Sequence, residues 1–187
     1  MKQRIAIVAV LILVATGITT ASSFTTATLS RDTNINVVSD SNGVIALVDG
    51  NSGGIVAEQS NGELTIDFTN AGSATGVNVE STYELGDPAN PSQRAFNITN
   101  QDSVDHTIEL NYTVSSGDGT SDGASSVEFR VYDSSGTNLA TEDEESGTAS
   151  FTATSGDSYA VVVIIDTTVG SLTDADDLSG TLAVTAT

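Results

Sequence analysis

The sequence of 187 residues contains no cysteine and no tryptophan, only two prolines, and a single lysine, Lys2. Without cysteine the chain can form neither a disulfide nor a thiolate metal site, and it offers no thiol for catalysis or lipidation. Five basic residues stand against 25 acidic ones, which gives a formal net charge of −20. Such a surface cannot neutralise phosphates, so the composition argues against binding to nucleic acid or to an anionic membrane surface.

The acidic residues are spread along the chain and do not form one tail. This distribution differs from the block of like charge that marks a disordered acidic arm. It fits either a generic acidic protein or a protein adapted to very high salt, where charge repulsion is screened within a few ångströms. The near absence of lysine favours high salt. With 38% hydrophobic residues, the length suits one domain with a substantial core.

The N-terminus has the order of a secretory signal peptide: Lys2 and Arg4, an apolar run from Ile5, then small residues. The apolar run is about 14 residues long, short of the roughly 20 that a membrane-spanning helix needs. We expect residues 1–21 to be removed after Ala21, which gives a secreted protein. Cleavage would remove two basic residues and no acidic one, so the net charge would fall to −22. A retained N-terminal membrane anchor is the alternative.

Alternation of period two recurs through the mature chain, and no window has the spacing of an amphipathic helix. Residues 63–68, 77–85, 94–99, 107–114, 127–131 and 180–187 alternate in this way. Two runs, 44–48 and 159–165, are continuously apolar, which is typical of strands at the centre of a sandwich or under a neighbouring surface. The segment 100–103 is predicted to be a hairpin turn, and 141–145 a solvated acidic loop. The spacing of nine to eleven short strands predicts an all-β, two-sheet β-sandwich, Ig-like or jelly-roll, over residues 39–187.

No catalytic constellation is visible, so we expect a protein that is not an enzyme. The single histidine, His106, stands beside Asp105, and a serine triad built on them would make the chain a secreted hydrolase. However, no Gly-x-Ser-x-Gly elbow and no His-Glu-x-x-His motif occurs. A lone histidine at the start of a strand is more often a surface residue.

Two loops bring carboxylates close together and are the candidates for a calcium site. Neither completes an EF-hand pattern, because position 3 of the first is Thr120 and Phe129 stands where the closing glutamate would be. In so acidic a chain most loop aspartates simply face water, so no cofactor is expected beyond this Ca²⁺ candidate. The candidate ligands are Asp118, Asp122, Asp174, Asp176 and Asp177.

Two sequons for N-glycosylation begin at Asn97 and Asn111. Strand parity places Phe96 and Ile98 on one face of their strand and Asn97 on the other. The same alternation separates Asn111 from its apolar neighbours. We therefore expect both asparagines to point outward, as a glycan requires.

The segment 24–47, FTTATLSRDTNINVVSDSNGVIAL, resembles the opening of a group of secreted proteins of halophilic archaea, and the resemblance extends through 63–68 and 96–101. More distantly, the order of signal peptide, short N-terminal strand and β-domain is similar to that of the TasA and camelysin group and of archaeal bundling pilins. The resemblance implies a filament whose subunits polymerise when the N-terminal strand of one completes a sheet of the next.

Carried onto this chain, the resemblance makes residues 22–38 the donor strand. Its odd-numbered face offers Ala27, Leu29, Ile35 and Val37, interrupted by Arg31 and Thr33. The alternative is that 24–38 pairs within its own subunit as a first strand. The expected function is thus a filament or biofilm-fibre subunit of the cell surface or extracellular matrix, with itself as the main partner. A monomeric exported domain that binds other cell-surface proteins or glycans is the first rival.

Overall fold

The computed structural model describes residues 37–187 apart from 71, 91, 116–125 and 171. The predicted signal peptide and all but the last two residues of the predicted donor strand lie outside the described residues. The described chain is all-β: its helical elements are the 3-10 turns η1 (Asp40–Asn42) and η2 (Phe68–Asn70). No helix in these residues is long and apolar enough to cross a membrane. The strands are β1 (Ile45–Asp49), β2 (Val56–Glu58), β3 (Leu64–Ile66), β4 (Thr82–Leu85), β5 (Phe96–Asn100), β6 (His106–Val114), β7 (Val127–Tyr132), β8 (Asn138–Asp143), β9 (Thr148–Ala153), β10 (Ser158–Asp166) and β11 (Gly180–Ala186).

The largest sheet has the order β1-β5-β10-β7-β8, and all of its pairs are antiparallel. Strand β10 is long enough to take two partners end to end along one edge, β5 along 158–161 and β4 along 163–166. Every described residue from Tyr159 to Ile165 is buried. The prediction that this continuous apolar run is a central strand is therefore confirmed.

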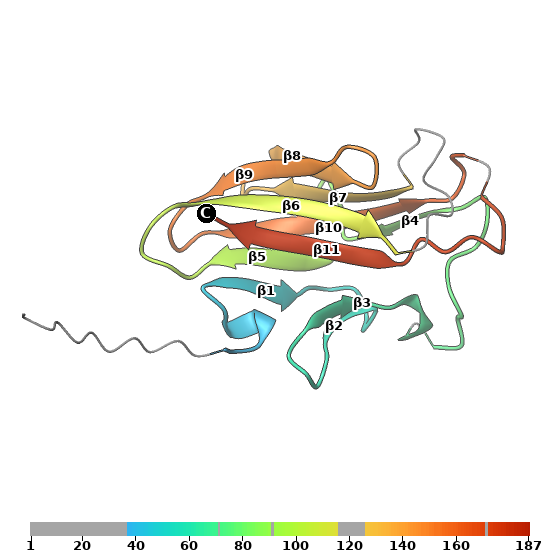
Figure 1. Ribbon diagram of the computed structural model, residues 1–187, viewed down its shortest axis with the longest axis horizontal. Helices are drawn as coiled ribbons and strands as arrows, with labels where there is room; N and C mark the ends of the chain where they lie inside the picture. Colours follow the sequence, from blue (N-terminus) through green and yellow to red (C-terminus); the bar gives the residue numbers. More distant parts are fainter. Residues whose placement is uncertain (1–36, 71, 91, 116–125, 171) are drawn as a thin grey trace, which may run out of the picture. The chain divides into compact units, whose positions relative to one another are not determined.

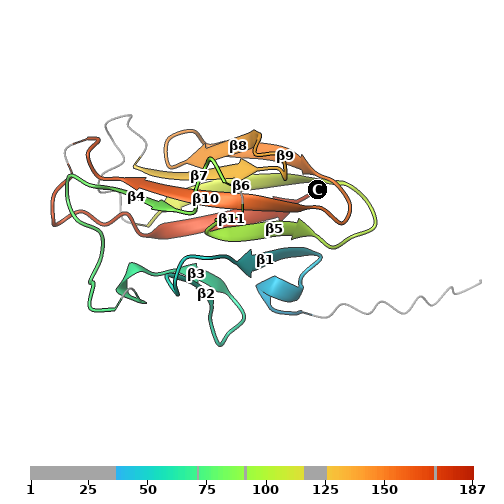
Figure 2. The same ribbon diagram turned by 180° about the vertical axis from the view of Figure 1, so that it is seen from behind.

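The second sheet, in the order β11-β6-β9, lies in front of the large sheet in Figure 1 and behind it in Figure 2. A third, two-stranded sheet pairs β2 with β3. It lies beside β1 and beyond the free edge of β11 (Figure 1).

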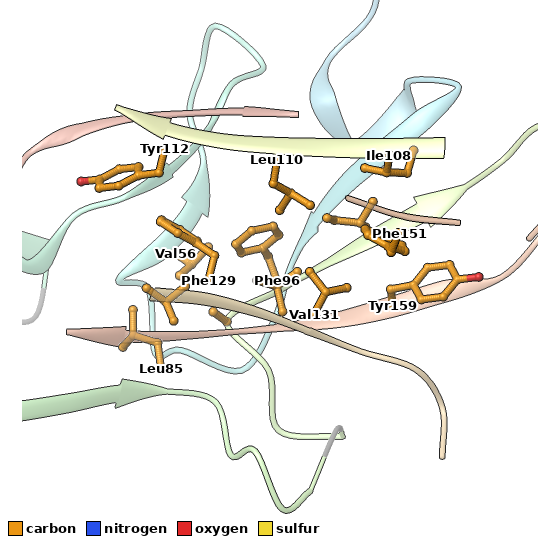
Figure 3. Close-up of a cluster of buried hydrophobic side chains, with 14 of the residues drawn as sticks. Val56, Leu85, Phe96, Ile108, Leu110, Tyr112, Phe129, Val131, Phe151 and Tyr159 are labelled. Carbon is orange, nitrogen blue, oxygen red and sulfur yellow. The ribbon is translucent and has the colours of Figure 1, made fainter. Parts of the chain in front are cut away.

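One hydrophobic core joins the three sheets. Alternating residues of β5, β6, β7 and β10 point into it, as their strict period of two predicts. Figure 3 shows Phe96 between Leu110 on one sheet and Val131 on the other. Aromatic pairs reinforce the two ends of the core: Tyr112 with Phe129, their ring centres 5.1 Å apart, and Phe151 with Tyr159 at 4.9 Å.

Four sequence predictions need correction. The strand expected over 77–85 forms only as β4, from Thr82. The turn after Asn100 does not close a hairpin: β5 belongs to the large sheet and β6 to the second, so the chain crosses between sheets there. The acidic run 141–145 is not wholly a solvated loop, because β8 extends to Asp143 and Glu142 is fully buried. The run 44–48 is not a central strand: β1 is an edge strand, and Val44 is 62% exposed.

The crossing at residues 101–105 is fixed by the side chain of Asn100, which is completely buried. Its Nδ2 donates to the carbonyl oxygens of Val104 at 2.8 Å and Ala153 at 2.9 Å. Its Oδ1 accepts the main-chain N–H of Asp102 at 2.9 Å. These bonds direct the chain from one sheet to the other, which a plain hairpin turn would not require.

Candidate functional site

A groove of about 1220 Å³ lies between β3 and β11, and we call it the β3–β11 groove. Its floor is apolar and is formed by side chains of the shared core. A typical small-molecule pocket has roughly 300–1,000 Å³, so the groove is large enough for a segment of polypeptide. Its floor residues include Leu47, Phe96, Phe129, Val163 and Ile165.

One wall of the groove is the free edge of β11, which pairs with β6 and with no other described strand. Thr107 and Thr187 exchange both main-chain hydrogen bonds at 2.9 Å, which fixes the alternation along this pair. Odd-numbered residues of β11 therefore bond to β6, and even-numbered residues direct their N–H and C=O groups away from it. The outward-directed residues are Gly180, Leu182, Val184 and Ala186.

The opposite wall is β3. The N–H of Asp67 donates to the carbonyl of Ile55 at 2.7 Å, which places Asp67 in a hydrogen-bonded pair with β2. By alternation, Leu64 and Ile66 direct their main-chain groups away from β2. Asp40 Oδ2 already accepts the N–H of Leu64 at 2.7 Å. The N–H and C=O of Ile66 have no hydrogen-bond partner among the described residues.

Tyr112 and Gly180 shape the rim at the start of β11. The phenol of Tyr112 donates to the carbonyl of Leu178 at 2.5 Å, which ties the segment before β11 to β6. Burial, with smaller contributions from Glu144 and Asp177, raises the pKa of Tyr112 to about 12. A Cβ at position 180 would lie 2.8 Å from the Tyr112 ring and in close contact with the carbonyl of Thr113. Glycine is therefore required for β11 to pass this ring.

The opposite side of the core, between β8 and β9, is closed. The buried carboxylate of Glu142 accepts the main-chain N–H of Tyr112 and that of Ala149, both at 2.8 Å. Burial raises the pKa of Glu142, and these two hydrogen bonds oppose the shift. The two larger sheets are thus joined along β8 and β9 and are open along the β3–β11 groove.

The predicted calcium ligands do not assemble in the part of the chain that the structure describes. Asp118 and Asp122 lie outside the described residues. Asp176 Oδ2 accepts the N–H of Thr173, and Asp177 Oδ1 accepts the N–H of Ser179 at 2.9 Å, so both stabilise turns. No group of three or more histidine, aspartate or glutamate side chains among the described residues is arranged to hold a metal ion. With Asp174, Asp176 and Asp177 in its lining, the groove has an acidic rim.

The side chain that His106 contacts is Asp102, with Nε2 2.8 Å from Oδ2, and not the adjacent Asp105. This contact lowers the pKa of Asp102. Asp105 instead accepts the N–H of Ser155 at 2.9 Å, and the Ser155 hydroxyl donates to the carbonyl of Asp102 at 2.7 Å. The triad that the hydrolase interpretation needs is therefore not formed by these residues.

Both sequon asparagines lie on strands, and the predicted parity holds at each. Phe96 and Ile98 are buried, whereas Asn97 is half-buried on the other face of β5. Asn111 is also half-buried, on β6, and its Nδ2 donates to the carbonyl of Gly147 at 2.9 Å. Of the donor-strand candidates, only Val37 is described: it is 97% exposed and belongs to no strand.

Comparison with protein-family models and with curated proteins finds no match to this chain. The sequence did not predict two features: the buried Glu142 and the β3–β11 groove. The burial of Glu142 could not be predicted because this residue stands in an acidic run. Only its spacing of two from Ala140 indicates an inward position. The groove could not be predicted because it depends on which strand edges remain unpaired, and that depends on contacts between residues far apart in the sequence.

Proposed function

We propose that this protein is a secreted, non-enzymatic structural subunit of the cell surface or extracellular matrix of a high-salt organism. Its domain, residues 39–187, is a two-sheet β-sandwich of Ig-like or jelly-roll type. Subunits assemble into a filament by strand complementation, with residues 22–38 as the inserted strand. The observation that carries this proposal is the β3–β11 groove of about 1220 Å³, which has apolar core residues at its floor, polar residues at its rim and an unpaired strand edge beside it.

The unpaired edge of β11 supports the proposal, because an exposed strand edge makes a protein prone to aggregation. A free strand edge beside exposed core residues favours uncontrolled pairing with other chains, and soluble proteins usually block it. Here the half-buried side chains of Leu182 and Val184 on β11 pack against the core at its open side. A strand added at this edge would bring main-chain hydrogen bonds and side chains for the groove floor. Repeated head-to-tail, such a contact produces a filament.

A monomeric exported binding domain is the second candidate, and the same groove supports it. In that case the groove would hold an extended peptide or glycan from another molecule, or residues 24–38 of the same subunit. The exposed start of the described chain favours the polymer, because Val37 is 97% exposed and Val38 52% exposed, so these two residues bury little apolar surface.

The test is negative-stain electron microscopy of the protein from its native secretion route, in molar salt, beside a variant that lacks residues 22–38. We expect filaments from the intact protein and folded single subunits from the truncated one. If the intact protein is monomeric and the truncated one unfolds, residues 22–38 belong to their own domain and the polymer proposal fails.

A further inference from the structure

A pocket of about 290 Å³ lies on the face of the large sheet that is turned away from the core, and Asn97 is part of its lining. Phe96 points into the core, so Asn97 on the same strand faces the other way. Opposite Asn97 on β10 stands Ala160, and opposite Ala160 on β7 stands Tyr132. The small side chain of Ala160 therefore leaves room directly beside the amide of Asn97. We call this space the Asn97 pocket.

The walls of the Asn97 pocket carry hydrogen-bonding groups. Its volume is at the lower end of the range for small-molecule pockets, so it suits one small polar group such as a single sugar ring. Serine hydroxyls, a guanidinium and a carboxylate surround the small floor residue Ala160. The polar lining consists of Ser92, Arg94, Asn97, Asp133, Ser134 and Ser158.

Arg94 is unusual because it has no acidic partner in the part of the chain that the structure describes. Its Nη1 donates to the carbonyl of Ser92 over a long 3.4 Å, and its buried Nε has no hydrogen-bond partner among these residues. Arg130, the other described basic residue, donates from Nε to Glu128 Oε2 at 2.7 Å. Burial of an unpaired donor is unfavourable. In a chain with 25 acidic residues, the free guanidinium of Arg94 points to an anionic partner from outside the fold.

The main chain holds Arg94 in place. The N–H of Asn51 donates to the carbonyl of Arg94 at 2.9 Å, and Gly86 forms a β-bridge with Arg94 on its other side. A Cβ on Gly86 would lie 3.0 Å from the Cα of Arg94, which shows how closely the two segments pass. The backbone thus fixes Arg94 at the pocket, while its guanidinium retains donors for a further partner.

We propose that the Asn97 pocket seats the first sugar of an N-linked glycan on Asn97, and that Arg94 binds an anionic group of that glycan. Asn97 is the acceptor of the sequon Asn97-Ile98-Thr99. In the transfer, Nδ2 of Asn97 attacks C1 of the first sugar of a lipid-linked oligosaccharide. The C1–N bond forms, the C1–O bond breaks with its electron pair left on the lipid phosphate, and Nδ2 loses one proton.

Attachment to Asn97 makes every contact of the glycan intramolecular, so a shallow pocket suffices to hold it. A guanidinium binds an anionic group through two parallel hydrogen bonds, and a rotation of the Arg94 side chain gives its Nε an acceptor. Asp133 Oδ1 already accepts the N–H of Ser135 at 2.9 Å. The anionic group therefore belongs on the Arg94 side of the pocket, and sugar hydroxyls on the Asp133 side.

The glycan seat is independent of the proposed assembly contact. Phe96 lines the β3–β11 groove and Asn97 lines the pocket, so the two sites lie on opposite faces of β5. A failure to form filaments would leave this inference untouched. Loss of the glycan would likewise leave the groove unchanged.

The test combines mass spectrometry with a double-mutant cycle, using protein from the native host. We expect the peptide that contains Asn97 to carry a glycan with a charged sugar, in the wild-type protein and in Arg94→Gln alike. In urea unfolding, Arg94→Gln should raise the unfolding equilibrium constant about tenfold when Asn97 is glycosylated. In the Asn97→Gln background the same substitution should change it by less than about threefold, because the guanidinium has no partner to lose.

Asn111→Gln is the matched control, since it removes the other sequon and leaves the Asn97 pocket intact. In this background Arg94→Gln should retain its effect of about tenfold. An unmodified Asn97, a glycan without a charged sugar, or an equal effect of Arg94→Gln with and without the Asn97 glycan overturns the proposal.

Discussion

The carboxylate of Glu142, on β8 of the large sheet, accepts the main-chain N–H of Tyr112, on β6 of the second sheet, at 2.8 Å. Its other oxygen accepts the N–H of Ala149 on β9. One buried side chain thus satisfies two main-chain donors where the β6–β9 pairing ends. It also joins the two sheets at the side of the core opposite the β3–β11 groove.

Replacing Glu142 by alanine should lower the free energy of unfolding by about 2–4 kcal/mol, because two buried N–H groups lose their acceptor. Urea denaturation followed by circular dichroism measures the change. The matched control is Glu109→Ala, which removes an exposed carboxylate from β6 and should change the value by less than about 0.5 kcal/mol. Equal effects in the two variants would contradict a structural role for Glu142.

The raised pKa of Glu142 also predicts a pH dependence. The folded protein binds the carboxyl proton of Glu142 more tightly than the unfolded chain does. The contribution of this protonation to the free energy of unfolding is therefore fully present below the usual pKa of 4.5. It is lost as the pH rises from that value through the folded pKa. Relative to Glu142→Gln, the wild-type protein should therefore become more stable as the pH falls from 7 to 4. Urea midpoints of both proteins at several pH values test this. A difference between the wild-type and Glu142→Gln midpoints that stays constant or shrinks as the pH falls contradicts it.

Gly180→Ala should lower the free energy of unfolding by about 1–3 kcal/mol, because the added methyl group meets the Tyr112 ring and the Thr113 carbonyl. Gly76→Ala is the control within the same groove lining, since a Cβ there meets nothing within 4 Å. Thermal unfolding of both variants measures the difference. A Gly180→Ala protein as stable as Gly76→Ala would mean that the start of β11 can move away from the ring.

Asn100→Asp should lower the free energy of unfolding by about 2–4 kcal/mol at neutral pH. The new carboxylate cannot donate to the carbonyls of Val104 and Ala153, and its buried charge would keep only the N–H of Asp102 as a partner. Gln101→Glu adds the same charge at the adjacent exposed position and should be nearly neutral. Chemical denaturation separates the two outcomes, and similar midpoints would contradict the role of Asn100 at the crossing between sheets.

Glycosylation should differ between the two sequons. The Nδ2 of Asn111 is held by the carbonyl of Gly147 in the folded protein, whereas Asn97 has no side-chain hydrogen bond to another described residue. We therefore expect a higher glycan occupancy at Asn97. Peptide mass spectrometry of the protein from its native host measures both sites, with Asn97→Gln and Asn111→Gln as controls. A higher occupancy at Asn111 would contradict this reasoning.

Local pattern predicted the all-β character and most strands because alternation is a short-range property. It succeeded best where one face of a strand is buried, as in β5 and β6, and in β10, whose seven-residue buried run lies between partners on both edges. It failed for the strand expected over 77–85, of which only β4 forms. Glu80 has a φ of 54° there, a left-handed conformation that interrupts a strand.

The remaining errors share one physical cause, which is that sheet membership depends on contacts far apart in the sequence. Nothing near Val44 shows that β1 is an edge strand, and nothing near Asn100 shows that the next strand joins another sheet. The groove follows from the same topology, because only the complete set of strand pairs identifies the unpaired edges of β3 and β11.

Disulfide cross-linking tests the polymer contact most directly, because the wild-type chain has no cysteine. One protein carries Leu182→Cys in β11, and a second carries cysteine at one of the four positions of the predicted inserted face. Each pair is mixed in molar salt under mild oxidation and analysed on a denaturing gel. The four positions are Ala27, Leu29, Ile35 and Val37.

We predict a covalent heterodimer for at least one of these positions, and none when Leu139→Cys, on the exposed edge strand β8, replaces Leu182→Cys. The corresponding double variant in a single chain should give a ladder of covalent multimers. No heterodimer at any position, or a double variant that closes only within its own chain, would contradict assembly through residues 22–38.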